Sequence, residues 1–135
     1  APRVGVSLIE FVEPFDAGDI RFEPVEFNHP LYILYSSGTT GVPKCIVHGT
    51  GGTLLQHLKE HRLHSDVKPG DRLFYFTTCG WMMWNWLVSA LAWGVTIVAV
   101  DGNVVHPAPG RLWELVDRHA VDVLAFDGAE RGEHA

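Results

Sequence analysis

Residues 73–100 contain no Asp, Glu, Lys or Arg, and this charge-free segment limits the possible folds more than any other feature of the chain. It is longer than the roughly 20 residues that a helix needs to cross a bilayer. The segment changes character along its length: strand-like at 73–76, broken at Cys79 and Gly80, helix-like at 81–93, stopped at Gly94 and β-branched at 95–100. These internal breaks predict a buried strand–helix–strand unit and not a membrane span.

The rest of the chain continues the alternation of strands and helices. Apolar runs without an in-out period predict buried strands, and apolar residues at helical spacing predict helices. The predicted strands are 31–35, 44–47, 72–76, 95–100 and 121–125, with a further short strand at 4–9, and the predicted helices are 54–64, 81–93 and 112–119. This order predicts an α/β fold with a mostly parallel sheet that is flanked by helices on both faces.

The first predicted helix has a start signal and an apolar face. Thr53 and Gln56 have the spacing of a capping box, in which each side chain satisfies a free backbone amide. The residues expected on the inner face follow helical spacing and are Leu54, Leu55, Leu58 and the aliphatic stem of Arg62.

Charge and cysteine content exclude several classes of protein. The chain has 16 acidic and 10 basic residues, a net charge of −6, which argues against a nucleic-acid-binding surface. Cys45 and Cys79 cannot form a disulfide framework and have no zinc-ligand spacing, so we expect a reducing, cytoplasmic environment. The chain has no initiator Met and no signal peptide, and we expect it to be a fragment or a processed chain.

Residues 35–44 combine four hydroxyl side chains, two glycines and one lysine between two predicted strands. Backbone amides near glycine, hydroxyl donors and a cation together suit a nucleotide phosphate. The order differs from a Walker A loop because Val42 and Pro43 separate the second glycine from Lys44, and Cys45 follows. On composition alone, a Ser/Thr/Gly turn with a solvated lysine remains an equal alternative.

The order of these residues, SSGTTGVPK at 36–44, closely resembles the phosphate loop of the adenylate-forming superfamily, which includes acyl-CoA synthetases, firefly luciferase and peptide-synthetase adenylation domains. The resemblance extends over roughly residues 25–126. Segments 30–35, 44–49, 54–61 and 77–86 are similar to the acetoacetate–CoA ligases within that superfamily. Cys45 fits these ligases, whereas acetyl-CoA synthetases normally have glycine there.

The resemblance implies a reaction in which an acid attacks the α-phosphate of ATP and the thiol of CoA then displaces AMP. It also implies that Mg²⁺ accompanies the ATP, that acetoacetate is the acid, and that one set of loop residues holds the β- and γ-phosphates: Ser36, Ser37, Gly38, Thr39, Thr40, Gly41 and Lys44. Trp81, Met82 and Met83 fall where related enzymes line the acyl pocket, and core packing at a helix start is an equal alternative for them.

Other candidate sites are weaker. His57, His61 and His64 share a helical face and could bind a metal, but without an HExxH order or a completing carboxylate we expect a solvated face and no metal site. Cys79 has no paired base, and we expect a buried, inert thiol. His48 is expected to be at most a supporting group near the nucleotide.

The resemblance covers only part of an adenylate-forming enzyme. The adenine- and Mg²⁺-binding segment, the ribose-binding Asp, the hinge and the C-terminal domain with a catalytic Lys have no counterpart here. We therefore expect a fragment of the large N-terminal domain: a connecting segment at 1–30, part of the AMP-binding domain at 31–126 and a divergent polar tail at 127–135. The isolated chain is expected to be inactive. The rival hypotheses are another short-chain acyl-CoA synthetase, such as an acetyl-CoA synthetase, and a non-catalytic nucleotide-binding module.

Overall fold

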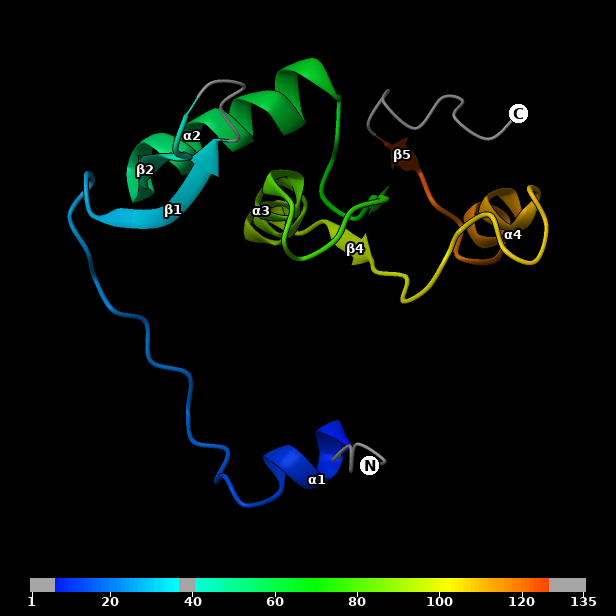
Figure 1. The fold of residues 1–135 in the computed structure, drawn as a ribbon, viewed down its shortest axis with the longest axis horizontal. Helices are drawn as coiled ribbons and strands as arrows, with labels where there is room; N and C mark the ends of the chain where they lie inside the picture. The colour runs from blue at the N-terminus through cyan, green and yellow to red at the C-terminus, as the bar shows by residue number, and fades with distance from the viewer. Residues whose placement is uncertain (1–6, 37–40, 127–135) are drawn as a thin grey trace.

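The computed structural model describes residues 7–36 and 41–126, which contain two separate sheets (Figure 1). Strands β1 (Pro30–Ser36) and β2 (Lys44–Gly49) form an antiparallel pair. Strands β3 (Arg72–Tyr75), β4 (Thr96–Val98) and β5 (Val123–Ala125) form a parallel sheet in the order β4-β3-β5. The predicted parallel sheet is thus confirmed for these three strands. The first two strands are antiparallel instead, because the connection at 37–43 is too short for a parallel crossover.

Helices cover both faces of the parallel sheet, as predicted. Helix α3 (Met82–Ser89), extended by the 3₁₀ turn η2 (Ala90–Trp93), connects β3 to β4, and helix α4 (Arg111–Arg118) connects β4 to β5. Gly94 ends the first connection in the left-handed region with φ +79°. The two helices lie on opposite sides of the strands (Figure 1). The charge-free segment therefore forms the buried strand–helix–strand unit that its internal breaks predict.

Successive side chains of β3 face opposite sides of the sheet and form two cores. Leu73 and Tyr75 pack with Trp86 and other residues of α3, whereas Phe74 packs with Leu115 of α4. Leu73 is 0% exposed and Phe74 is 2% exposed. Burying one such side chain contributes about 1.5–3 kcal/mol. Both faces of β3 are buried, which explains why its sequence is uniformly apolar.

Helix α2 (Thr50–Lys59), continued by the π-helical turn η1 (Glu60–His64), differs from its prediction in where it starts. It begins at Thr50 instead of near Thr53, directly after β2. The Oγ1 of Thr50 donates to the carbonyl oxygen of His29 at 2.8 Å. Gln56 forms no capping box, because its Nε2 donates to Oε1 of Glu60 at 2.8 Å. The tight passage from β2 into the helix sets the start, and Thr53 becomes a buried interior position.

The predicted inner face of α2 is also wrong. Thr53 and His61 are the buried residues of this helix and its π-helical turn. Of the predicted inner face, Leu54, Leu55 and Arg62 are exposed and Leu58 is half-buried. The helix contacts β1, β2 and α3. These partners lie on the side of Thr53 and His61, so tertiary packing decides the face that is buried.

The N-terminal part of the chain contains a short helix where a strand was predicted. Residues 4–6 lie outside the described part, and helix α1 (Leu8–Val12) follows. Ser7 and Glu10 form a capping box: the Ser7 amide donates to Oε2 of Glu10 at 2.8 Å, and the Glu10 amide donates to Oγ of Ser7 at 3.2 Å. These two bonds satisfy free amides at the helix start and favour helix over strand.

An extended, exposed segment follows α1 and leads to β1, so that α1 lies apart from the two sheets (Figure 1). It joins the body where the Gly51 amide donates to the carbonyl oxygen of Phe27 at 2.8 Å. The assignment of residues 1–30 as a connecting segment stays a prediction, and the tail at 127–135 lies outside the described residues. Within 7–36 and 41–126, each helix is too short or too polar to cross a bilayer.

Candidate functional site

The end of the β1–β2 hairpin holds the described members of the predicted phosphate loop. Ser36 and Lys44 are paired across the two strands. Gly41 has φ +121°, a backbone conformation that favours glycine. Lys44 is exposed, and no ion pair of its ammonium group occurs among the described residues. The remaining members, Ser37, Gly38, Thr39 and Thr40, lie outside the described residues. The hairpin thus brings one hydroxyl, one glycine with positive φ and one cation to the same end of the molecule.

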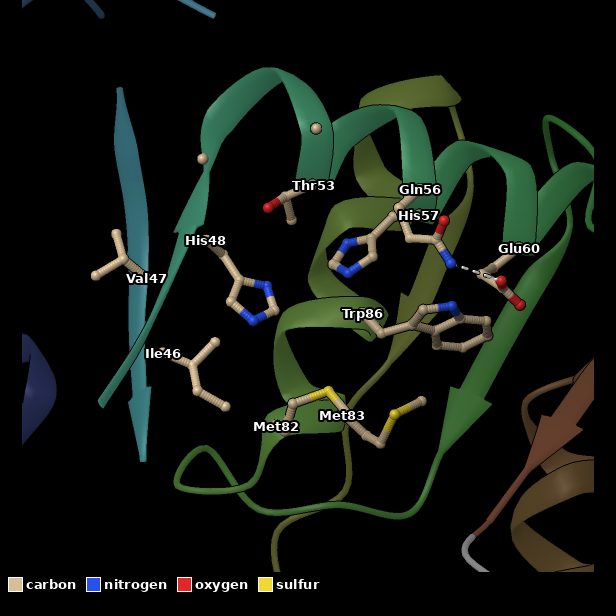
Figure 2. Close-up of a pocket in the computed structure, with 12 residues that line it drawn as sticks. Ile46, Val47, His48, Thr53, Gln56, His57, Glu60, Met82, Met83 and Trp86 are labelled. Carbon is tan, nitrogen blue, oxygen red and sulfur yellow. Dashed lines mark hydrogen bonds between the residues drawn. The ribbon is translucent and has the colours of Figure 1, made fainter. Parts of the chain in front are cut away.

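A cavity of about 570 Å³ lies between β2, α2 and α3 (Figure 2). Of the three predicted acyl-pocket residues, Met82 and Met83 line this cavity, and Trp81 does not. Trp81 is the N-cap residue of α3 and is 58% exposed. The other lining residues are Ile46, Val47, His48, Gly49, Gly52, Thr53, Gln56, His57, Glu60 and Trp86. The cavity is therefore mainly apolar with a few polar groups, which is typical of small-molecule sites.

Two histidines face each other across this cavity. His48 comes from β2 and His57 from α2, and Figure 2 shows the nitrogen-bearing edges of both rings turned toward each other. Nδ1 of His57 is buried and has no hydrogen-bond partner among the described residues. Burial lowers the pKa of His57, and the nearby His48 lowers it further, while Glu60 opposes the shift. The His57 imidazole is therefore held neutral at pH 7.

Glu60 supplies the negative charge of the cavity. Its Oε1 accepts a hydrogen bond from Gln56 and lies 3.1 Å from Nζ of Lys59. The hydrogen bond from Lys59 lowers the pKa of Glu60, and the charges of His64, Lys59 and His57 act in the same direction. This carboxylate stays ionised, and its charge is paired with the ammonium group of Lys59.

His61 is buried, which contradicts the expected solvated face. It is 0% exposed, and its ring stacks on Trp86 at a centroid distance of 4.0 Å. Nε2 lies 3.0 Å from the carbonyl oxygen of Trp86 and donates to it, and Ser89 Oγ donates to the same oxygen at 2.7 Å. Within 7–36 and 41–126, no group of three or more His, Cys, Asp or Glu is placed to hold a metal ion, and the expected absence of a metal site stays a prediction.

The buried imidazoles predict that acid destabilises the fold. Burial lowers the pKa of His61, against the opposing bond to Trp86, so the folded state binds a proton less readily than an unfolded imidazole of pKa about 6.5. The stabilisation that comes from the neutral, buried His61 is fully present above pH 6.5 and is lost as the pH falls below that value. Urea unfolding between pH 8 and pH 5 should show a decrease of at most about 1.4 kcal/mol per pH unit from His61.

Two variants test the origin of this pH dependence. His61→Phe should flatten the acid limb, because it removes the titrating group and keeps an aromatic ring. His64→Gln should leave the limb unchanged, because His64 is exposed. A flat stability profile in the unsubstituted protein would show that His61 accepts a proton in the folded state without penalty.

A second cavity, of about 430 Å³, opens at the carboxyl ends of β3 and β4. Its polar lining comes from Thr77, Thr78 and Asp101, and Cys79 also lines it. Cys79 and Cys45 are free and exposed, so the prediction of a buried Cys79 is wrong. Strand β3 ends at Tyr75, so Cys79 lies in the turn between β3 and α3. The sequence could have indicated this cavity, because two neighbouring parallel strands are each followed by a turn, and ligands of α/β sheets bind at such turns.

The fold and the loop define an α/β domain with a Ser/Thr/Gly/Lys hairpin loop beside a parallel sheet. The family described as AMP-binding enzyme matches residues 7–126, and the chain belongs to this family. The match begins before the resemblance at 25–126 and includes α1. The resemblance to the adenylate-forming superfamily is thereby confirmed.

Three relatives show which branch of the family is similar. Acetoacetyl-coenzyme A synthetase of Rhizobium meliloti (strain 1021) is 64% identical over 109 residues, which are 79% of this chain and 17% of that protein. Malonamoyl-CoA synthetase of Penicillium aethiopicum is 62% identical over 90 residues, 67% of this chain and 12% of that protein. The structure of acetoacetyl-CoA synthetase from Streptomyces lividans has a TM-score of 0.79 and 48% identity, and covers 87% of this chain and 18% of its own. The chain thus spans less than a fifth of these proteins.

Proposed function

We propose that this chain is part of an ATP-dependent acyl-CoA ligase that activates acetoacetate. The observation that carries the proposal is the 64% identity to the Rhizobium meliloti acetoacetyl-coenzyme A synthetase over 79% of the chain. The 48% identity and TM-score of 0.79 to the Streptomyces lividans enzyme support it. The activity belongs to a full-length protein, and we expect the 135-residue chain alone to form no acyl-CoA.

The proposed reaction has two steps. A carboxylate oxygen of acetoacetate attacks the α-phosphorus of ATP, and pyrophosphate leaves with the electrons of the broken P–O bond. The thiolate sulfur of CoA then attacks the acyl carbonyl carbon, and AMP leaves. Both leaving groups are anions, so groups that stabilise developing negative charge accelerate the reaction.

The hairpin loop fits the first of these leaving groups. We assign the β- and γ-phosphates of Mg²⁺-ATP to the predicted loop set at positions 36–41 and 44. Ser36 and Lys44 are paired at one end of the hairpin, which supports a shared hydroxyl and ammonium site for one phosphate group. Mg²⁺ would enter with the nucleotide as part of the substrate, since no cluster of metal-binding side chains occurs within 7–36 and 41–126.

The cavity beside α3 fits the acyl group. Met82 and Met83 line it with apolar surface, and Trp81 is the N-cap residue of the same helix. The relatives are named for acetoacetyl and malonamoyl groups, which both carry a carbonyl oxygen on the third carbon. We therefore propose short 3-oxo acids as the substrate class. We also propose a cytoplasmic location, with which the free, exposed thiols of Cys45 and Cys79 are consistent.

The products of the full-length protein test this proposal. With ATP, Mg²⁺ and CoA, the protein should convert acetoacetate to its CoA thioester and release AMP, as measured by mass spectrometry and nucleotide chromatography. Acetate in place of acetoacetate should give a lower kcat/KM. A preference for acetate would assign the chain to an acetyl-CoA synthetase, and ATP binding without any thioester would indicate a non-catalytic nucleotide-binding module.

A further inference from the structure

The cavity between α2 and α3 has a polar centre in an apolar wall. His57 and His48 present their ring nitrogens to the same space (Figure 2), and Met82, Met83 and Ile46 supply apolar surface around it. Among the described residues, neither imidazole forms a salt bridge or a hydrogen bond that would occupy its ring nitrogens. Polar groups left open in a mainly apolar cavity point to a ligand with a matching polar atom.

The buried nitrogen of His57 indicates where its proton lies. Nδ1 is shielded from solvent and has no partner among the described residues. A buried N–H group without an acceptor is rare and costly, so the favoured tautomer leaves Nδ1 without a proton and places the proton on Nε2. Figure 2 shows the nitrogen-bearing edge of the His57 ring, which includes Nε2, turned toward His48. His57 therefore offers an N–H donor to the cavity.

The charges around this donor select the kind of acceptor. His57 is neutral at pH 7, because burial and His48 lower its pKa. Glu60 lines the same cavity as an ionised carboxylate. The Glu60 carboxylate is already paired with Lys59 at 3.1 Å, and a second carboxylate beside His57 would find only a neutral imidazole to compensate the loss of its solvation. A neutral carbonyl oxygen accepts a hydrogen bond from a neutral donor without this penalty.

We propose that His57 binds the 3-oxo oxygen of the acyl substrate through Nε2–H and so selects 3-oxo acids over unsubstituted acids of equal length. His48 bounds the opposite side of this oxygen, and Met82 and Met83 contact the terminal carbon. The inference rests on the proposed function, since it names the residue that recognises the acid of the same reaction. A site that hydrogen-bonds a substrate oxygen rejects analogues that lack it.

A substrate-by-variant comparison in the full-length protein tests this role. The acids are acetoacetate and butyrate, which have four carbons each and differ in the 3-oxo group. The variants are His57→Leu, which removes the donor, His57→Gln, which keeps an N–H donor, and His64→Leu as an exposed control on the same helical segment. The measurement is kcat/KM for acid-dependent exchange between pyrophosphate and ATP.

His57→Leu should lower kcat/KM for acetoacetate by roughly tenfold, the loss of one hydrogen bond in a buried site, and leave the value for butyrate within about twofold. His57→Gln should recover part of the kcat/KM for acetoacetate that His57→Leu loses, and His64→Leu should leave kcat/KM unchanged for both acids. Equal losses for both acids, or no loss for acetoacetate, would overturn the role of His57. An unsubstituted protein that exchanges with butyrate alone, or with neither acid, would overturn the proposed function and this inference with it.

Discussion

Replacement of Lys44 by alanine should lower kcat/KM for ATP in the full-length protein by roughly 10²–10³-fold, the effect of removing one preorganised group that stabilises developing charge. Lys44 begins β2, opposite Ser36, and is exposed at the loop end of the hairpin. Its ammonium group would lie against the departing pyrophosphate, where negative charge increases most in the first step. The measurement is acetoacetate-dependent exchange between pyrophosphate and ATP.

Two matched variants separate this role from a general effect of charge. Lys44→Arg keeps the cation and should recover part of the activity, with a residual loss because a planar guanidinium does not replace a compact ammonium. Lys68→Ala removes an exposed lysine that pairs with Asp66 at 2.9 Å and should leave the exchange rate unchanged. Activity of Lys44→Ala within threefold of the unsubstituted protein would remove Lys44 from the phosphate site.

His61→Ala should lower the free energy of unfolding by about 3 kcal/mol, the range of a large-to-small change in a core combined with a lost buried hydrogen bond. His61 is 0% exposed, stacks on Trp86 and has Trp93 at a centroid distance of 4.9 Å. The substitution leaves a cavity between α2 and α3 and removes one donor to the Trp86 carbonyl oxygen. Urea unfolding followed by tryptophan fluorescence measures the loss.

Graded variants show which part of His61 matters. His61→Phe keeps the ring, and Ser89 Oγ continues to donate to the Trp86 carbonyl oxygen, so we expect a loss of only about 1 kcal/mol. His64→Ala changes an exposed side chain and should remain within about 0.5 kcal/mol of the unsubstituted protein. If His61→Ala were as stable as His64→Ala, the tight packing of η1 on α3 through His61 would be refuted.

The strand–helix–strand unit at 73–100 could be predicted because its signals are local. A uniformly apolar strand, a break at Gly80, a helical run and a stop at Gly94 describe β3, α3 and β4 in order. Burial on both faces removes the in-out period from the strand sequence. Such a strand can therefore be recognised without knowledge of its neighbours in the fold. The loop at 36–44 was recognisable for a different reason, because the order of its residues is characteristic.

The buried face of α2 could not be read from its own sequence. Leu54, Leu55 and Leu58 have the apolar spacing of an inner face, yet Thr53 and His61 are the buried positions, and Leu58 is only half-buried. The partner that buries His61 is Trp86, 25 positions along the chain. Helix periodicity marks apolar stripes, but the neighbouring elements determine which stripe is buried.

The cavity was predicted only in part for the same reason. Met82 and Met83 are adjacent in sequence and were named together, whereas His57 reaches the cavity from another helix and was expected to be solvated. The start of α1 shows the converse error. Ser7 and Glu10 have capping-box spacing that the sequence displays, whereas the strand prediction at 4–9 rests on apolar alternation alone.

Exchange between labelled pyrophosphate and ATP, measured on the full-length protein without CoA, tests the central claim most directly. This exchange requires reversible formation of an acyl-adenylate and no later step. The account predicts exchange that depends on acetoacetate, is at least tenfold weaker with acetate, and falls with Lys44→Ala. Absence of exchange with acetoacetate, or equal exchange with acetate, would contradict the assignment of this chain to an acetoacetate-activating ligase.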